Sequence, residues 1–216
     1  MNSIRPLPAY LARRFHGWKA TAHRENRAWY RRLSEDGQRP RELIIACCDS
    51  RVHVTAMFGG DSDELFIHRN IAALVPPFDP DGRHHATSAV VEYAVETLRV
   101  SHLIVLGHAG CGGVRSCYDM CAGHAPHLDA PDSYVGRWLD ILRPTFETLP
   151  RDLDPEEAVG RLEREAVRAS LGNLLGFPSV RTAVDADEVS LHGLWTDIAA
   201  GTLEAYDPIR GRFAPV

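Results

Sequence analysis

The alternation of apolar and polar positions predicts a chain of alternating strands and helices. Residues 43–47 and 102–106 are short runs made almost entirely of apolar side chains, which is typical of strands buried in a parallel sheet. Between them, residues 87–98 repeat apolar side chains at the three- and four-residue spacing of a helix, with Thr87 as the expected N-terminal cap. Strand, helix and strand in this order predict a right-handed parallel crossover.

Further elements extend this pattern on both sides. Residues 8–35 have the spacing of one or two amphipathic helices, and residues 75–85 form a loop rich in proline and aspartate. The other expected elements are strands at 64–68, 189–195 and 202–206 and helices near 131–149 and 155–175. The sequence therefore predicts an α/β fold with a mostly parallel central sheet flanked by helices. We expect a single domain over residues 1–216 that includes an N-terminal helical arm over residues 1–37.

Composition is consistent with one globular domain in a reducing compartment. The chain has 216 residues, of which 44% are hydrophobic, and this is enough for a substantial core. No apolar stretch approaches the roughly 18 residues of a membrane span, and the first residues lack the apolar stretch of a signal peptide. We therefore expect a cytoplasmic protein with no membrane partner. Five cysteines in such a compartment favour metal binding or catalysis over disulfide bonds.

Charge is distributed unevenly along the chain. The net charge is −5, yet residues 1–41 hold ten Lys/Arg against three Asp/Glu, so a basic arm precedes an acidic body. The arginines of the arm alternate with Trp18, Trp29 and Tyr30 at helical spacing. This pattern suits an arm packed on a partner subunit or a solvated helix face. A nucleic-acid surface is the third alternative, and we expect no nucleic-acid partner.

Two polar clusters directly follow the two predicted buried strands. One reads CCDSR and the other reads GHAGCGG. Both lie at the carboxyl ends of parallel strands, which is where open α/β sheets place their ligand sites. Cys47 or Cys48 can then come within reach of His108 and Cys111, giving a Cys–His–Cys set.

This set indicates zinc. Thiolate and imidazole are preferred zinc ligands, and three protein ligands with an open fourth position are typical of a catalytic site rather than a structural one. The glycines of the second cluster permit close backbone approach and begin a helix, whose positive end favours a thiolate. Because side chains alternate along a strand, Cys47 is expected to share a side with Asp49 and Arg51. Cys48 then points away as a small buried hydrophobe.

Three segments, CCDSRV, HRNIAALV and LGHAGCGGV, resemble the signatures of the β-class carbonic anhydrases, in the same order and at similar separation. The likeness covers residues 38–114 in motif detail and, more weakly, almost the whole chain. It implies reversible hydration of carbon dioxide to bicarbonate and a proton, with one Zn²⁺ per subunit. By resemblance, Cys47, His108 and Cys111 are the zinc ligands and Cys48 occupies a variable position.

Charge at such a centre suggests a mechanism. Zinc held by two thiolates and a neutral imidazole is formally uncharged, so we expect a weaker Lewis acid than zinc held by three imidazoles. Asp49 is placed to accept a hydrogen bond from zinc-bound hydroxide and aim its lone pair at carbon dioxide, while Arg51 keeps Asp49 ionised by pairing with it. The alternative is an Asp–Arg surface pair on a turn. The resemblance implies the same dyad, and also a closed state in which Asp49 itself binds zinc.

The resemblance also assigns a carbon dioxide pocket. Gln38 supplies an amide, Phe66, Ile71 and Tyr93 form the walls, and the backbone of Gly112 adds a contact. In this family several of these groups come from the neighbouring subunit, which implies a homodimer at minimum and allows a tetramer or higher. From the sequence alone, Phe66, Ile71 and Tyr93 would be core residues.

The chain resembles the plant-like subgroup, which lacks bicarbonate regulation. Regulated members carry a tryptophan three residues before the zinc cysteine, and this chain has Ile44 there, which offers no donor to a buried anion. Gln38 and Tyr93 also match the plant-like, bacterial type. Arg69 occurs in both subgroups, and we expect it to pair with an acid. The resemblance thus implies an open site at neutral pH.

Three functions remain possible from the sequence. The first is reversible carbon dioxide hydration, the second is hydration of carbon disulfide or carbonyl sulfide on the same scaffold, and the third is a non-enzymatic zinc or thiol module. A non-enzymatic zinc module would need a closed four-ligand shell. The Asp49–Arg51 pair beside a three-ligand site therefore favours an enzyme.

Overall fold

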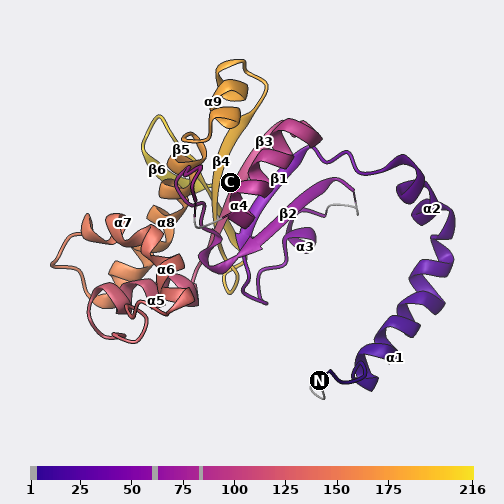
Figure 1. Ribbon diagram of the computed structural model, residues 1–216, viewed down its shortest axis with the longest axis horizontal. Coiled ribbons are helices and arrows are strands. Elements are labelled where there is room, and N and C mark those ends of the chain that lie inside the picture. The colour runs from indigo at the N-terminus through magenta and orange to yellow at the C-terminus, as the bar shows by residue number, and fades with distance from the viewer. Residues whose placement is uncertain (1–3, 60–62, 83–84) are drawn as a thin grey trace. The chain divides into compact units, whose positions relative to one another are not determined.

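A computed structural model describes residues 4–59, 63–82 and 85–216 (Figure 1). The chain divides into two compact units, one ending at Arg39 and the other beginning at Pro40. Among the described residues, no helix combines the length and the apolar character needed to span a membrane.

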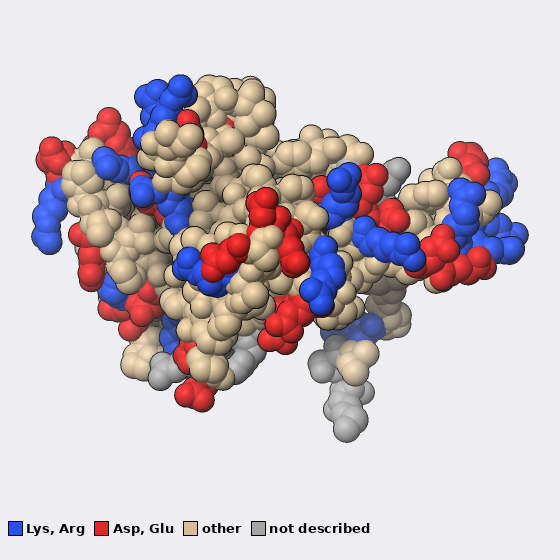
Figure 2. Space-filling model, turned by 90° about the horizontal axis from the view of Figure 1, so that it is seen from above, with Lys and Arg blue, Asp and Glu red and all other residues tan. Residues whose placement is uncertain are grey.

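The N-terminal unit is helical, as the spacing over residues 8–35 predicts. It consists of α1 (Ala9–Trp18), the π-helical turn η1 (Lys19–His23) and α2 (Arg27–Asp36). None of these three helical segments contains a buried residue, and the side chains of Tyr10, Phe15 and Trp18 are exposed. Acidic and basic side chains lie side by side on this unit (Figure 2). Tyr10, Phe15 and Trp18 therefore keep much of their apolar surface uncovered within the arm itself.

The second unit is built on one sheet, and this confirms the predicted α/β fold. Within the described residues the sheet has six strands in the order β2-β1-β3-β4-β5-β6. The first four are parallel, and the last two pair antiparallel. Their bounds are β1 (Glu42–Cys47), β2 (Leu65–Asn70), β3 (His102–His108), β4 (Ser190–Asp197), β5 (Thr202–Asp207) and β6 (Arg212–Pro215). The sequence pattern did not predict β6.

Helices flank this sheet, and Figure 1 shows α5, α6 and α7 gathered beside it. The predicted helix near 131–149 is broken into three short segments, and α3 and α9 were not predicted. The helical segments are α3 (Val54–Phe58), η2 (Ile71–Ala73), α4 (His85–Glu92), η3 (Tyr93–Leu98), α5 (Gly112–Cys121), α6 (Tyr134–Leu139), η4 (Asp140–Leu142), α7 (Arg143–Glu147), α8 (Pro155–Leu174) and α9 (Pro178–Asp185).

The expected cap at Thr87 is wrong. The helix already begins at His85, so Thr87 lies inside its first turn. The Thr87 side chain is buried, and its hydroxyl lies 3.0 Å from Nε2 of His68. A tertiary contact between α4 and β2 therefore takes the hydroxyl that local chemistry would assign to the helix end. The preceding loop was predicted over residues 75–85, and its residues 83 and 84 lie outside the described part.

Strand alternation divides the core between the two faces of the sheet. On one face, Leu43, Val105 and their neighbours pack against Val167 of α8 and Val180 of α9. On the other face, Ile44 and its neighbours pack against the segment that enters α3, while several side chains there remain partly buried. The two faces follow from the alternating direction of successive side chains along each strand.

Two features of the fold place the polar clusters together. β1 and β3 are adjacent and parallel, and Ala46 lies opposite Leu106, so both strands end at the same edge. Behind them α8 approaches closely, because Gly107 has no side chain. A Cβ atom at Gly107 would lie 2.7 Å from Cγ2 of Val167. This close approach brings α8 against the end of β3.

Candidate functional site

The three predicted ligands meet at one buried site. Cys47 ends β1, His108 ends β3 and Cys111 directly precedes α5. Their ligand atoms all lie within 4.8 Å of one another, and the two sulfur atoms are 3.9 Å apart. Cys47 and His108 are far apart in sequence. They meet because β1 and β3 pair in parallel and end at the same edge of the sheet.

His108 is held in an orientation that suits a metal ligand. Its Nδ1 lies 3.0 Å from the carbonyl oxygen of Ala109, a distance at which an Nδ1–H donates, so we assign the lone pair to Nε2. Nε2 is buried and has no hydrogen-bond partner within the described part of the chain. Because an unpaired buried polar atom is costly, this nitrogen requires a ligand. Two sulfur atoms and one imidazole nitrogen are the donors that zinc prefers.

The two thiols cannot both ionise easily without a cation. A hydrogen bond from Cys111 lowers the pKa of Cys47 to about 4, although burial opposes this shift. The backbone N–H of Asp49 also points to the sulfur of Cys47, at 3.4 Å. The hydrogen bond to Cys47, together with burial, raises the pKa of Cys111. A divalent cation would remove this conflict by neutralising two adjacent thiolates.

Asp49 and Arg51 form the predicted pair beside these ligands. Nε of Arg51 donates to Oδ1 of Asp49 at 2.9 Å and Nη2 donates to Oδ2 at 2.6 Å, which is a bidentate arrangement. These hydrogen bonds hold the pKa of Asp49 well below its usual range. Nη2 of Arg51 also donates to the carbonyl of Gly110 at 3.0 Å. Oδ2 of Asp49 lies 4.0 Å from Nε2 of His108, so the carboxylate faces the ligand set.

The expectation that Cys48 is buried is wrong, because its side chain is exposed. β1 ends at Cys47, so the alternation of a regular strand no longer determines where Cys48 points. Its backbone N–H donates to the carbonyl of Asn70 at 2.8 Å. Cys48 therefore lies outside the ligand set, as expected, but for a different reason.

Glu163 is a site residue that the motif analysis missed. It is 4% exposed, and its Oε1 accepts the backbone N–H of Cys111 at 2.9 Å. Burial raises the pKa of its carboxyl group. One signal was present in the sequence, since Glu163 falls on the apolar stripe of the predicted helix 155–175, between Leu162 and Ala166. An acid at a core position needs a buried partner.

Arg69 supports the first cluster from the neighbouring strand. Its Nε donates to the carbonyl of Cys47 at 2.8 Å, and its Nη2 donates to the carbonyl of Asp49 at 2.6 Å. The sequence predicted that Arg69 would pair with an acid, whereas these two hydrogen bonds go to backbone carbonyl groups. Arg69 therefore fixes the backbone on both sides of Cys48, where the strand has already ended.

The residues assigned to a substrate pocket come from several different elements of the chain. The rings of Phe66 on β2 and Tyr93 on η3 have centroids 6.0 Å apart. Tyr93 is 45% exposed and Ile71 is 38% exposed, so the expectation from the sequence alone that they are core residues is wrong. Gly112 is exposed in the first turn of α5. Gln38 is exposed and belongs to the N-terminal unit.

The position of Ile71 depends on a strained turn. Ala72 and Ala73 have φ values of 65° and 55°, a conformation that is unfavourable for residues with a side chain. Nε1 of Trp138 donates to the carbonyl of Ile71 at 2.8 Å. A Cβ atom at Gly113 would lie 2.7 Å from Cγ2 of Ile71, so the turn packs directly on the start of α5.

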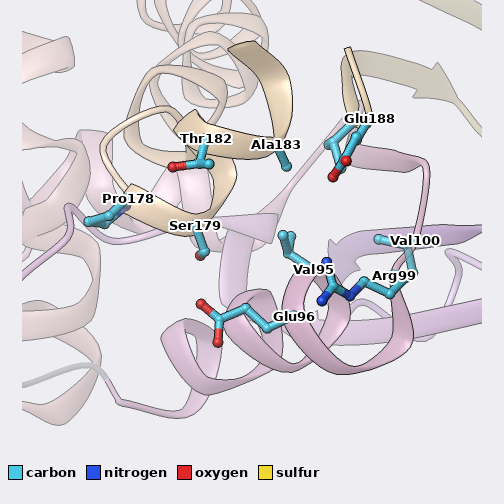
Figure 3. A pocket seen from close by; sticks show the side chains of 10 residues that line it. Val95, Glu96, Arg99, Val100, Pro178, Ser179, Thr182, Ala183 and Glu188 are labelled. Atoms are coloured by element: carbon cyan, nitrogen blue, oxygen red, sulfur yellow. The ribbon is translucent and has the colours of Figure 1, made fainter. Parts of the chain in front are cut away.

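A separate cavity of about 850 Å³ lies between η3 and α9 (Figure 3). Val95 and Ala183 contribute apolar surface to it, and Glu96, Arg99 and Glu188 also line it. None of the metal-binding or Asp–Arg residues lines this cavity. It is therefore not part of the site described above.

Comparison with known proteins identifies relatives along most of the chain. The carbonic anhydrase family model matches residues 42–203. Beta carbonic anhydrase 3 of Arabidopsis thaliana is 32% identical over 196 residues, which cover 89% of this chain and 74% of that protein.

Solved structures show the same fold. The β-carbonic anhydrase CcaA superimposes with a TM-score of 0.87 at 26% identity, covering 96% of this chain and 98% of CcaA. One of two tetrameric β-carbonic anhydrases from the ascomycete Sordaria macrospora has a TM-score of 0.70 at 28% identity. The match covers 91% of this chain and 95% of that chain.

Replacing Glu163 should reveal how much its hydrogen bond to Cys111 contributes to the free energy of unfolding. We expect Glu163→Ala to destabilise the metal-free protein by about 1–3 kcal/mol, because the buried N–H of Cys111 loses its acceptor. Glu163→Gln keeps an oxygen there and should cost less. Urea denaturation measures the free energy of unfolding, and Glu157→Gln, an exposed position on the same helix, is the control. Equal losses for the alanine and glutamine variants would contradict this role.

Proposed function

Because the chain belongs to the β-class carbonic anhydrases, we propose that it catalyses the reversible hydration of carbon dioxide to bicarbonate and a proton at a zinc ion. The observation that carries this proposal is the buried Cys47–His108–Cys111 set with the Asp49–Arg51 pair directly beside it. The test is a stopped-flow carbon dioxide hydration assay on zinc-loaded protein. Carbon disulfide and carbonyl sulfide serve as comparison substrates, and a preference for either would contradict the proposal.

Cys47, His108 and Cys111 would hold one Zn²⁺ per subunit. Three protein ligands leave a fourth position open. When bound, zinc lowers the pKa of a coordinated water and so supplies a nucleophile near neutral pH. Glu163 supports this arrangement by accepting the N–H of Cys111, and the His108–Ala109 hydrogen bond keeps Nε2 available.

Asp49 would orient the attacking oxygen. Its Oδ2 faces the ligand set, so the carboxylate can accept a hydrogen bond from that oxygen and direct a lone pair at the carbon of the substrate. Arg51 holds the carboxylate ionised and fixed through two hydrogen bonds. Arg69 keeps the backbone carbonyls on either side of Cys48 in place. Positioning of this kind lowers the barrier because the geometry is established before reaction.

Carbon dioxide is small and apolar, so its pocket needs apolar walls. Phe66, Ile71 and Tyr93 would supply them, and the backbone of Gly112 and the amide of Gln38 would add polar contacts. The exposure of Ile71 and Tyr93 within one chain supports a pocket that a second copy completes.

We further propose a cytoplasmic homo-oligomer, at least a dimer, in which the arm over residues 1–37 packs on a partner subunit of the same single-domain chain. The arm helices contain no buried residue, although they carry large apolar side chains. Covering such apolar side chains with a partner surface lowers the free energy of the assembly. The tetrameric enzymes of Sordaria macrospora support this assembly.

The metal assignment predicts a contrast between adjacent cysteines. Cys47→Ser, His108→Ala and Cys111→Ser should each abolish both zinc binding and activity, because each removes one of three ligands. Cys48→Ser should retain both, since the Cys48 side chain is exposed outside the ligand set. Metal analysis of the purified variants provides the measurement. Zinc loss in Cys48→Ser with retention in Cys47→Ser would reverse the assignment.

Activity should rise with pH in a simple, non-cooperative titration. Arg51 holds the pKa of Asp49 below its usual range, so Asp49 stays ionised through neutral and mildly acidic pH and does not shape the profile. The rise then follows ionisation of the attacking water alone. Ile44 is buried and offers no donor to a regulatory anion. A steep cooperative profile that bicarbonate shifts upward would contradict an open site at neutral pH.

Deleting residues 1–35 should weaken association and lower turnover together. The arm carries apolar surface that we assign to the subunit contact, and the pocket residues would be completed across that contact. Sedimentation velocity and the hydration assay on the same preparation measure both effects. A fully active monomer would exclude the proposed role of the arm.

A further inference from the structure

Two histidines and a serine lie together at the amino ends of β3 and β4. His102 is the first residue of β3, and it pairs in register with Ser190, the first residue of β4. His192 follows Ser190 by two residues, so both point to the same face of the sheet. This cluster is at the opposite end of β3 from His108. Six residue steps of about 3.3 Å place it about 20 Å from the carbonic anhydrase site.

The polar atoms of the three side chains form a closed triangle. Nδ1 of His102 lies 2.8 Å from Oγ of Ser190, and Oγ lies 2.9 Å from Nε2 of His192. Nε2 of His192 lies 3.3 Å from Nδ1 of His102. The two imidazole nitrogens therefore converge on one point, although they come from different strands.

The nitrogen spacing matches that of two ligands on one ion. Zinc–nitrogen bonds of about 2.0–2.1 Å at a tetrahedral angle place the two nitrogens about 3.3–3.4 Å apart. The observed separation of 3.3 Å is therefore compatible with two ligands on one cation.

The surroundings favour a cation at this point. Partial desolvation, followed by the proximity of His102, lowers the pKa of His192, which favours the unprotonated imidazole. Glu42 of β1 is in register with His102, so its carboxylate projects from the same face of the sheet. His192 is exposed and His102 is partly exposed, so an ion can reach them from solvent in the chain described here.

We propose that His102 and His192 form a second metal site, for a divalent transition ion such as Zn²⁺ or Ni²⁺. Imidazole nitrogen selects such ions over Mg²⁺ and Ca²⁺, which take oxygen ligands. Water completes the coordination, and the Ser190 hydroxyl stays a hydrogen-bonding neighbour of the two imidazoles. The ion would join the amino-terminal residues of two adjacent strands in the folded protein. Binding therefore also stabilises the folded state. This site is independent of the proposed hydration reaction.

The test is zinc uptake by the full-length protein after it has been loaded with one zinc per chain at the Cys47–His108–Cys111 site. Equilibrium dialysis against buffered free Zn²⁺ should show a second equivalent for the wild-type protein, with a higher melting temperature. His102→Ala and His192→Ala should each weaken this uptake by about tenfold or more. Both should lose the rise in melting temperature while keeping normal carbon dioxide hydration.

Two matched variants separate coordination from hydrogen bonding and from adventitious binding. Ser190→Ala removes the hydroxyl but keeps both imidazoles, so it should still bind the second zinc. His124→Ala removes an exposed histidine elsewhere and should behave as wild type. The proposal is overturned if the wild-type protein binds one zinc only. It is equally overturned if the His102 and His192 variants take up the second zinc as well as the wild type.

Discussion

The parallel pairing of β1 with β3 is the constraint on which the site depends. Residues far apart in sequence, Cys47 and His108, become neighbours because two adjacent parallel strands end at one edge of the sheet. The apolar runs of both strands are buried, so a register shift would disturb the core as well as the site. The energy that holds the ligands together is thus mostly the energy of the core.

Backbone hydrogen bonds to charged side chains then set the finer geometry. Arg69 binds carbonyl groups next to the first ligand, Glu163 accepts the N–H of Cys111, and Arg51 links Asp49 to the carbonyl of Gly110. These charged side chains come from β2, from α8 and from the turn after β1, and all of them bind backbone or side-chain groups where β1 and β3 end. Gly107 makes the contribution of α8 possible, because a side chain there would hold the helix away. Rigid positioning of the ligands follows from this framework.

The two ends of β3 carry different chemistry on one rigid element. At the carboxyl end, buried thiols and an imidazole face a carboxylate held by arginine. At the amino end, two imidazoles and a hydroxyl converge in a more exposed position. The difference in burial matters, since buried thiolates need a cation to coexist, whereas the outer imidazoles can remain neutral without one. The arm helices, with no buried residue, are a third region, and we propose a partner subunit for it.

Local sequence determined the strands other than β6, most of the helices and the two ligand clusters, because apolar runs, helical spacing and motif chemistry are properties of neighbouring residues. The choice of Cys47 over Cys48 could be argued from alternation and resemblance, yet the exposure of Cys48 could not, since it depends on where β1 ends. Glu163 joined the site, and Thr87 became a partner of His68 instead of a cap. Only the tertiary structure decided these roles, because each depends on contacts between segments distant in sequence. The place of Glu163 on the apolar stripe of its helix indicated a buried partner, but not which partner.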